Sequence, residues 1–470
     1  MELNDLSIKS LELAESAHIH FIGIGGSSMS GLAELTLKQG YKVTGSDSQS
    51  PDSLLKLEDL GAVVYHGHDA SNITSDIVLV VYTVAVGDDN VELVRARKLG
   101  LLTVERGIFL GFIAGHFGES VAVSGVHGKT TTTSMLAAIL TKSGKNPSVH
   151  LGGVIPWAKS NVIAGGNEYF ITEACEYHNN FLHVGAKIGI LLNLEAEHLD
   201  FFGTFENMKA SFEKFAENIP ADGTLIVCAD NENASDAAKK ARCKVIKYSV
   251  SDKNADYYGE IYEKKETKCV MDGYTFGLYE NGKYLTDISL NVPGKHNVSD
   301  ALAAIAAARE LGCDCEGIRL GFDMFHGTGR RFEVIGDING ACVISDYAHH
   351  PTEVAATISA ARTQTKKKVI AVFQPHTYSR VLLLRDKFPP AFKLADDIVI
   401  TDIYAAREPY TPEMSGEILS DDLKRAGLNS RYIGPFEDIV KYLNETAREG
   451  DIVLILGAGT IDGIRLMVNG

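Results

Sequence analysis

Short apolar runs alternate with longer stretches of helical periodicity along almost the whole chain. Up to about residue 115, the apolar runs predict strands at His18–Ile24, Tyr41–Gly45, Ile77–Val81 and Leu102–Val104. The stretch Ser28–Gln39 predicts a helix after the first of them. Alternating strands and helices are typical of a parallel sheet with helical crossovers, so this segment predicts one α/β unit.

A second α/β unit begins with the apolar run before Gly125. It is expected to contain strands and helices in alternation, at Tyr169–Thr172, Ile188–Leu192, Phe205–Glu217 (helix), Thr224–Cys228 and Asp300–Leu311 (helix). The segment Tyr257–Leu290 has a denser β character, with turn signals at Asp272-Gly273 and Asn281-Gly282. We expect a β-meander added to the second unit there.

The remaining apolar runs predict strands at Cys342–Asp346, Val369–Phe373, Asp397–Thr401 and Ile452–Leu456. The sequence therefore predicts an α/β fold of three successive domains, with boundaries at 1–116, 117–327 and 328–470. The composition agrees with this class, because 45% of the 470 residues are hydrophobic and there are 45 glycines but only 12 prolines.

The net charge of −16 argues against binding of a nucleic-acid polymer or an anionic membrane through bulk charge. An anionic ligand must then be held by local lysines, arginines and helix ends. The seven cysteines are scattered and indicate reduced thiols in a cytoplasmic protein. We expect neither an export signal nor a membrane span, because no suitable apolar run is present.

The segment Val121–Thr133 predicts a phosphate-binding loop. An apolar strand leads into a turn from Gly125 to Gly128, and Lys129 and Thr130 open a helix. In such loops, backbone N–H groups and the lysine hold the phosphates, and the threonine hydroxyl binds Mg²⁺. The full pattern has a glycine at position 123, where this chain has Val123. The alternative is a plain strand–turn–helix junction with an exposed lysine.

The first unit has a second glycine loop, Gly23-Ile24-Gly25-Gly26, between its first strand and helix. Asp47 ends the next strand, where dinucleotide folds place a ligand of the ribose. This predicts a site for a nucleotide diphosphate. A hydride-transfer enzyme could use such a site, but it would not also need the phosphate-binding loop of the second unit. Two nucleotide sites suggest that one carries a tagged substrate and the other supplies ATP.

Other polar motifs follow predicted strands or precede predicted helices. They are Glu173, His198, G-K-H-N (Gly294–Asn297), H-G-T-G-R-R-F (His326–Phe332), S-D-Y-A-H-H-P-T (Ser345–Thr352) and F-Q-P-H-T-Y-S-R (Phe373–Arg380). Open α/β sheets bind ligands at the carboxyl ends of their strands. Each motif taken singly could also be a loop with helix caps.

Taken together, these motifs resemble the Mur ligase family over essentially the whole chain. The resemblance rests on G-I-G-G-S-S-M-S-G-L-A, G-V-H-G-K-T-T-T, E-A-C-E-Y-H, N-L-E-A-E-H-L-D, G-K-H-N, H-G-T-G-R-R-F-E, D-Y-A-H-H-P-T-E and F-Q-P-H-T-Y-S-R, in family order. The first and the last two are similar to the alanine-adding branch. The family's own phosphate loop also lacks the glycine at position 123.

The resemblance implies an ATP-dependent ligase that joins L-alanine to the lactyl carboxylate of UDP-N-acetylmuramate in peptidoglycan precursor synthesis. A Rossmann-like N-terminal domain would hold the UDP-sugar, a central domain ATP and Mg²⁺, and a Rossmann-like C-terminal domain the amino acid. It implies a UDP-sugar site of Gly25, Gly26, Ser27, Met29, Ser30 and Asp47. It implies ATP contacts from Gly125, Val126, His127, Gly128, Lys129, Thr130, Thr131, His296, Asn297, Arg331 and Asp346.

The same resemblance implies metal ligands at Thr130, Glu173 and His198, and an amino-acid site of His349, His376 and Arg380. Lys129, His198, Arg331 and His349 would be catalytic. Three positions depart from the family pattern, namely Asp300, Thr377 and Thr460. Two alternatives stay open: a related ligase that joins a free peptide to the same UDP-sugar, and a nucleotide-binding dehydrogenase or sensor. A monomer and a homodimer are both compatible with the sequence.

Overall fold

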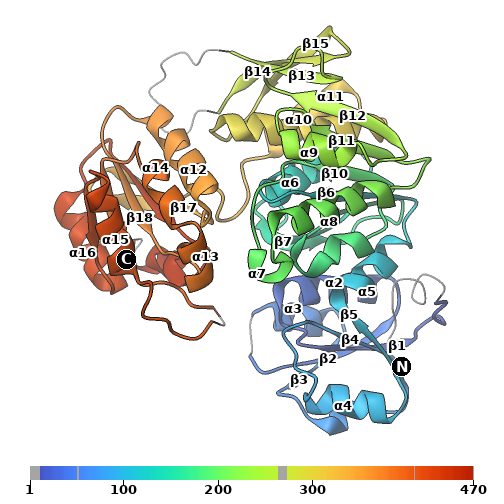
Figure 1. Cartoon of the computed structure of the whole chain (residues 1–470). Coiled ribbons are helices and arrows are strands. Elements are labelled where there is room, and N and C mark those ends of the chain that lie inside the picture. The colour runs from blue at the N-terminus through green and yellow to red at the C-terminus, as the bar shows by residue number, and fades with distance from the viewer. Residues whose placement is uncertain (1–10, 50–51, 263–272, 407, 469–470) are drawn as a thin grey trace. The chain divides into compact units, whose positions relative to one another are not determined.

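The structure is a computed structural model that describes residues 11–49, 52–262, 273–406 and 408–468 (Figure 1). It contains three separate sheets. Proximity of Cα atoms divides the chain into two compact units. The first consists of Met1–Gly259, Leu278–Thr286 and Ser299–Met324, and the second of Glu260–Gly277, Asp287–Val298 and Phe325–Gly470.

The first sheet is parallel and has the strand order β3-β2-β1-β4-β5. Its strands are β1 (His18–Ile22), β2 (Lys42–Asp47), β3 (Val63–His66), β4 (Ile77–Tyr82) and β5 (Leu102–Glu105). Its helices are α2 (Ser27–Lys38), α3 (Asp52–Asp59), η1 (Ala70–Asn72), α4 (Val91–Lys98) and α5 (Arg106–Ala114). The strand order reverses between β1 and β4, which is where sheets of this type bind nucleotides.

The predicted strand His18–Ile24 ends two residues early, at Ile22. Gly23 has φ +81°, a left-handed conformation that leaves the strand and begins the loop. On one face, α2 and α5 cover the sheet, and on the other face α4 does so.

A buried polar cluster joins α4 to the first sheet. Glu92 is fully buried, and its carboxylate accepts hydrogen bonds from Ser46 of β2 and from Asn72 Nδ2 at 2.6 Å. His20 Nε2 of β1 lies 3.6 Å from the same carboxylate. Because a buried charge without partners is very costly, these contacts are what allow Glu92 to sit inside the domain.

The second sheet has ten strands in the order β15-β14-β13-β12-β11-β10-β6-β9-β7-β8. They are β6 (Glu119–Ser124), β7 (Ser148–Ile155), β8 (Ser160–Ile163), β9 (Tyr169–Glu173), β10 (Ile188–Leu191), β11 (Thr224–Cys228), β12 (Lys244–Ser249), β13 (Tyr257–Ile261), β14 (Thr275–Glu280) and β15 (Lys283–Ser289). Its helices are α6 (Lys129–Lys142), η2 (Tyr177–His183), α7 (Leu199–Phe202), α8 (Phe205–Asn218), α9 (Glu232–Ala238), α10 (Lys295–Glu310) and α11 (Cys315–Met324).

The predicted meander is present as β13, β14 and β15. Asn281 and Gly282 join β14 to β15 with φ values of +49° and +74°, the conformation that favours Asn-Gly in a two-residue hairpin loop. The other expected turn involves Asp272, which lies outside the described residues. The predicted helix Asp300–Leu311 begins earlier, at Lys295. Gly294, with φ +100°, lies directly before the helix, so the rest of the G-K-H-N motif forms its first turn.

The third sheet has the order β16-β17-β21-β18-β19-β20 and is parallel except for the pair β16–β17. Its strands are β16 (Glu333–Ile338), β17 (Ala341–Asp346), β18 (Val369–Phe373), β19 (Asp397–Ile400), β20 (Ser430–Tyr432) and β21 (Ile452–Leu456). Its helices are α12 (Pro351–Gln364), α13 (Tyr378–Leu383), η3 (Arg385–Lys387), α14 (Phe388–Ala391), α15 (Gly416–Arg425), α16 (Phe436–Thr446), η4 (Thr460–Ile464) and α17 (Arg465–Val468).

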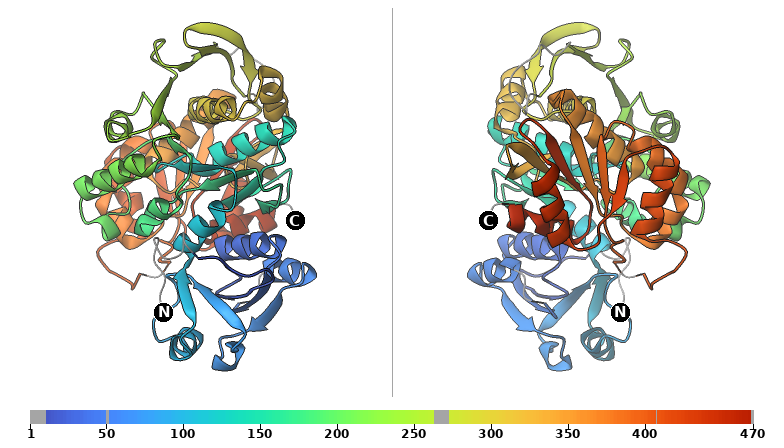
Figure 2. Two further views of the ribbon diagram at one scale, coloured as in Figure 1. Left: turned by 90° about the vertical axis from the view of Figure 1, so that its right-hand side faces the viewer. Right: turned by 90° about the vertical axis from the view of Figure 1, so that its left-hand side faces the viewer.

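Both faces of the third sheet carry helices (Figure 2). Side chains of α12, α14 and α15 pack on one face, and those of α16 and η4 pack on the other. The α/β class and the three predicted sheets are therefore confirmed. The domain boundaries at 116 and 327 stay a prediction. In the described part of the chain, no helix is both long and apolar enough to cross a membrane.

Candidate active site

The phosphate-loop segment has the predicted order of strand, glycine turn and helix. β6 ends at Ser124, and Gly125 and Gly128 have φ values of +137° and +86°. A Cβ at Gly128 would lie 2.5 Å from the carboxylate of Asp300, so position 128 requires glycine on two counts. The N–H groups of the first turn of α6 then face the end of the loop, an arrangement that can bind an anion.

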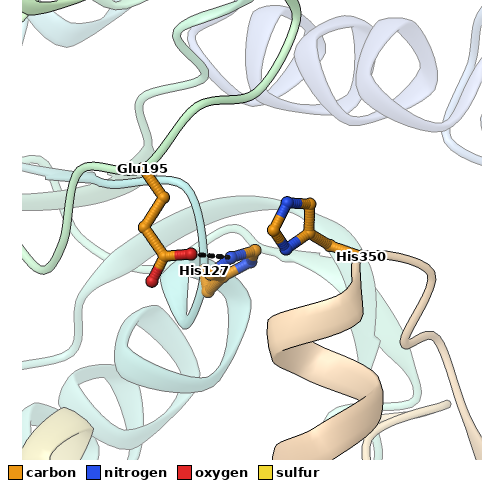
Figure 3. Close-up of side chains that lie close together, drawn as sticks. All are labelled: His127, Glu195 and His350. Atoms are coloured by element: carbon orange, nitrogen blue, oxygen red, sulfur yellow. Dashed lines mark ion pairs between the residues drawn. The ribbon is translucent and has the colours of Figure 1, made fainter. Parts of the chain in front are cut away.

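Asn193, after β10, fixes the conformation of this loop. Its Oδ1 accepts from the His127 N–H at 2.9 Å, and its Nδ2 donates to the His127 carbonyl at 3.0 Å. The His127 ring lies 3.8 Å from Glu195 (Figure 3). His350, also drawn there, belongs to the second unit.

Lys129 points back over its own loop. Its Nζ donates to the Val126 carbonyl at 3.1 Å and to Glu176 Oε2 at 2.9 Å. Burial alone would lower the pKa of Lys129, but nearby acids, Glu176 first among them, raise it above its ordinary value. The loop therefore carries a charged lysine whose counter-ion is a protein carboxylate. Glu176 was missed in the sequence, although it stands in E-A-C-E-Y-H beside Glu173.

Glu176 also reaches His198. The Nε2 atom of His198 lies 3.5 Å from Glu176 Oε1, whereas Lys129 contacts the other oxygen, Oε2. His198 has a left-handed backbone conformation and its ring lies 4.7 Å from that of Tyr177. The structure thus brings two predicted residues, Lys129 and His198, to one buried acid.

Glu173 and Thr130 each lie close to a glycine of β7. A Cβ at Gly152 would lie 3.4 Å from Glu173 Oε2, and a Cβ at Gly153 would lie 2.9 Å from Thr130 Cγ2. Glu173 Oε1 is buried and has no hydrogen-bond partner among the described residues. Carboxylate and hydroxyl oxygens are ligands of hard divalent cations, so the two residue types suit the predicted Mg²⁺ site, which stays a prediction.

The glycine loop of the first sheet is held by Asp47. Its Oδ2 accepts from the Gly25 N–H at 2.8 Å and its Oδ1 from the Gln49 N–H at 2.9 Å. Gly26 precedes α2 without a side-chain cap. The start of α2, where Ser27, Met29 and Ser30 lie, can therefore bind an anion.

Arg106, at the start of α5, is a further candidate that sequence reasoning missed. Its Nη1 donates to Ser28 Oγ at 3.0 Å, and Ser28 Oγ lies 3.2 Å from His150 Nε2 of β7. Burial lowers the pKa of His150 to about 4, so this ring is neutral at pH 7. Burial also lowers the pKa of Arg106, which Cys175 and Glu105 partly offset. Its place at the first residue of a helix after a strand was the available signal.

In the second unit, Asp346 pins the loop that carries Arg331. Its Oδ2 accepts from the Phe332 N–H at 2.7 Å and its Oδ1 from the Ala348 N–H at 2.8 Å. Burial raises the pKa of Asp346, against the opposing effect of Arg331 and these N–H groups. The Arg331 guanidinium lies 5.1 Å from the centre of the Tyr347 ring. Contact of Asp346 with the ATP ribose stays a prediction.

The three residues predicted to bind the amino acid lie together. Arg380 Nη1 is 2.8 Å from His376 Nδ1, and the His349 and His376 rings are 5.8 Å apart. Tyr404, which was not predicted, lies 5.5 Å from the His376 ring. Thr377 has φ +62°, an unusual backbone conformation for a β-branched residue, and strain of this kind is often found at functional sites.

His296 and Asn297 lie at the start of α10, within the second unit. The Asn297 amide donates to the Pro293 carbonyl at 2.6 Å, and His296 is exposed. A Cβ at Gly294 would lie 2.5 Å from the His296 ring, so the glycine makes room for it. Their contact with adenine stays a prediction.

Three family models match successive parts of this chain. The Mur ligase family catalytic domain matches residues 18–118, the Mur ligase middle domain 123–308, and the Mur ligase glutamate ligase domain 330–459. The chain belongs to the Mur ligase family. It is 44% identical over 444 residues to UDP-N-acetylmuramate–L-alanine ligase of Acetivibrio thermocellus, covering 94% of both chains.

Solved structures of Mur ligases give the same result for the fold. The UDP-N-acetylmuramate-alanine ligase MurC of Thermotoga maritima is 29% identical with a TM-score of 0.78, and the match covers 96% of this chain and 98% of that one. A murein peptide ligase of Psychrobacter arcticus is 26% identical with a TM-score of 0.68, covering 96% and 98%.

Proposed function

We propose that this chain joins L-alanine to the lactyl carboxylate of UDP-N-acetylmuramate, with ATP converted to ADP and phosphate, in peptidoglycan precursor synthesis. One observation carries the proposal: the chain is 44% identical to UDP-N-acetylmuramate–L-alanine ligase of Acetivibrio thermocellus, over 94% of both lengths. The residues gathered around the phosphate loop suit the first half of this reaction.

A carboxylate is a poor electrophile, so it must first receive a phosphoryl group from ATP. In this step a carboxylate oxygen bonds to the γ-phosphorus and the bond to the ADP oxygen breaks. The protein's task is to hold and neutralise phosphate charge. Lys129 and the first turn of α6 would bind the phosphates, and Lys129 would exchange Glu176 for a phosphate oxygen. Arg331 would contact the transferring phosphoryl group.

A divalent cation fits the donor set described above. Thr130 and Glu173 would hold one Mg²⁺, and His198 a second, and the metal would supply further charge neutralisation for the phosphates. The buried, unpartnered Oε1 of Glu173 supports this assignment.

In the second half, the alanine amine attacks the acyl carbon, and phosphate leaves from a tetrahedral intermediate as the amine gives up a proton. His349, His376 and Arg380 would bind the amino acid, with the Arg380 guanidinium paired to its carboxylate. The UDP part would lie on the glycine loop held by Asp47, at the start of α2.

The peptide-joining ligase remains the alternative within the family; its solved structure has a TM-score of 0.68 against 0.78 for the alanine ligase structure, at similar identities of 26% and 29%. A dehydrogenase or sensor does not agree with membership of a ligase family along the three sheets. A cytoplasmic location and a monomeric or dimeric state stay predictions.

The test is phosphate release with ATP, Mg²⁺ and UDP-N-acetylmuramate, adding single amino acids or a murein tripeptide in parallel. We expect release with L-alanine and little with the tripeptide. Lys129→Ala serves as the inactive control. Release with the tripeptide and none with L-alanine would replace our proposal with the peptide-joining ligase.

A further inference from the structure

Glu353 lies in the first turn of α12, at the end of the D-Y-A-H-H-P-T-E motif. Its side chain is only 12% exposed. It lies between two residues to which the proposed function gives separate tasks. The following contacts all lie within the second unit.

One carboxylate oxygen of Glu353 serves the His349 segment. Oε2 accepts from the N–H groups of His349 and His350 at 3.1 and 3.2 Å, and it lies 3.3 Å from His349 Nδ1. Glu353 therefore holds His349 through both its ring and its backbone N–H. His349 Nδ1 also lies 3.0 Å from the Tyr347 carbonyl, so two acceptors fix the ring orientation.

The other oxygen of Glu353 faces Arg331. The distance from Oε1 to Arg331 Nη1 is 3.9 Å, within range of a charge interaction. The guanidinium also lies on the Tyr347 ring, and the Tyr347 and His349 rings meet edge to face at 5.6 Å. One carboxylate and one aromatic ring thus contact both Arg331 and His349.

We propose that Glu353 is a positioning residue that holds Arg331 and His349 in a fixed relation to each other. The inference rests on the roles proposed above for those two residues. Arginine has many rotamers in solution, and an anion at a fixed place restricts where its guanidinium can lie. Because the carboxylate is largely buried, its charge acts at low dielectric and holds both partners more firmly than an exposed acid would.

The plain alternative is that Glu353 only caps α12. It does take part in a capping box with His350, whose side chain accepts from Thr352 N–H. Capping needs an acceptor oxygen but not a negative charge. Glu353→Gln keeps an acceptor oxygen of the same reach and removes the charge, so it separates the two roles.

We expect Glu353→Gln to raise the KM for L-alanine and to lower kcat, with a combined loss in kcat/KM of about tenfold or more, because misplaced groups lose near-attack geometry. The KM for UDP-N-acetylmuramate and the thermal unfolding midpoint should stay near wild type. Ser415→Ala is the matched control, because it removes the side-chain cap of α15 in the same unit and should leave the kinetics unchanged. Wild-type kinetics in Glu353→Gln would overturn the inference.

A double-mutant cycle decides whether Glu353 acts through its neighbours. In a His349→Ala background, Glu353→Gln should no longer change the KM for L-alanine, and in an Arg331→Ala background it should no longer change kcat. Effects that simply multiply in both backgrounds would overturn the inference. If His349→Ala and Arg331→Ala themselves have wild-type kinetics, the proposed roles of those residues fail and the inference fails with them.

Discussion

Glu176 contacts two side chains to which the proposed reaction gives different tasks. Lys129 lies 2.9 Å from one of its oxygens and His198 lies 3.5 Å from the other. The acid is almost completely buried, so its charge is poorly screened. Glu173, three residues earlier, differs from it in having an oxygen without a partner among the described residues. The two acids of this motif thus differ: both oxygens of Glu176 contact side chains, whereas one oxygen of Glu173 is available to a ligand.

This difference predicts the effect of Glu173→Gln. The amide keeps the shape of the side chain but loses the charge that attracts a hard cation. We expect the Mg²⁺ concentration for half-maximal activity to rise, on the order of tenfold or more. The measurement is a Mg²⁺ titration of phosphate release at saturating substrates. Glu168→Gln, an exposed acid just before β9, is the control and should titrate as wild type. An unchanged curve in Glu173→Gln would show that the metal assignment is wrong.

Single residues differed in how far the sequence could predict their place. Lys129 follows from a motif whose residues are adjacent in the chain, so local spacing was sufficient. The contacts that single out Glu176, Arg106 and Glu353 are made with residues that are distant in the chain or belong to a separate motif. One sequence has no signal for such contacts. An acid at the start of a helix is more often a cap, and only the structure shows what else it touches.

At the scale of elements, loops at the carboxyl ends of strands carry nearly every candidate residue. β1, β6, β9 and β17 each end in a loop with a residue that the motifs singled out. Glycines shape two of these loops, and the fold itself does not require a glycine at position 26. Its φ is −60°, and an added Cβ would meet the Gly23 carbonyl only at 3.5 Å. A side chain there therefore affects a ligand more than the loop.

Gly26→Leu should raise the KM for UDP-N-acetylmuramate by about tenfold or more, because a pyrophosphate must approach the backbone closely at this position. The KM for ATP should stay unchanged. Gly463→Leu is the control, since an added Cβ at that position contacts nothing within 4 Å. Weaker ATP binding with normal UDP-sugar binding would contradict the assignment of the first glycine loop.

The link between α4 and the first sheet predicts a pH dependence of stability. Burial would raise the pKa of Glu92, but the nearby His20 ring and the hydrogen bonds from Ser46 and Asn72 outweigh it and lower the pKa to about 2, from an ordinary value of 4.5. A lowered pKa means that the stabilisation is complete above pH 4.5 and is lost as the pH falls towards 2. This lowering of the pKa corresponds to a contribution to the free energy of unfolding on the order of 3 kcal/mol.

Glu92→Gln should therefore lower the free energy of unfolding at pH 7, and the difference from wild type should shrink as the pH falls below 4.5. Urea unfolding at a series of pH values from neutral to acidic measures it. Glu58→Gln, an exposed acid on α3, should follow wild type throughout. A difference that stays constant with pH would contradict the role of the Glu92 charge.

The elements themselves were predicted best where apolar runs are long and uninterrupted. β11, β18 and β21 are buried along their whole length and β6 is buried from Ser120 onward, and each was predicted from such a run. β7 was missed because Gly152 and Gly153 interrupt its pattern. β20 was missed because it has only three residues, and β16 because it is a partly exposed edge strand whose pairing is antiparallel. Tertiary pairing, which the local pattern does not contain, decided these three.

At the scale of the whole molecule, the candidate residues divide between the two compact units. Lys129, Glu173 and His198 belong to the first, whereas Arg331, His349, His376 and Arg380 belong to the second. The three sheets and the motif order were predictable, because each sheet is built from successive segments of the chain. How the units are arranged during the reaction was not, because short motifs say nothing about distances between units.

The proposed reaction requires the alanine amine to come within about 3–3.5 Å of the acyl carbon. The groups that bind the two reactants lie on different units, so we expect them to close together when the substrates bind. Small-angle scattering should give a smaller radius of gyration with UDP-N-acetylmuramate plus a non-hydrolysable ATP analogue than without ligand. Arg380→Ala should raise the KM for L-alanine far more than that for ATP. An unchanged radius and an unaffected alanine KM together would remove the proposed role of the second unit.

The pairing of Lys129 with Glu176 has a consequence for turnover. Lys129 is already ion-paired with Glu176. In the proposed reaction, a phosphate oxygen of ATP must therefore replace the Glu176 carboxylate as the partner of Lys129. Glu176 would then compete with ATP for Lys129: it would weaken the apparent affinity for ATP, and it would pair with the lysine again when ADP and phosphate depart. Such an exchange keeps a buried charge compensated at every stage and makes departure of the products easier than it would be from an isolated lysine.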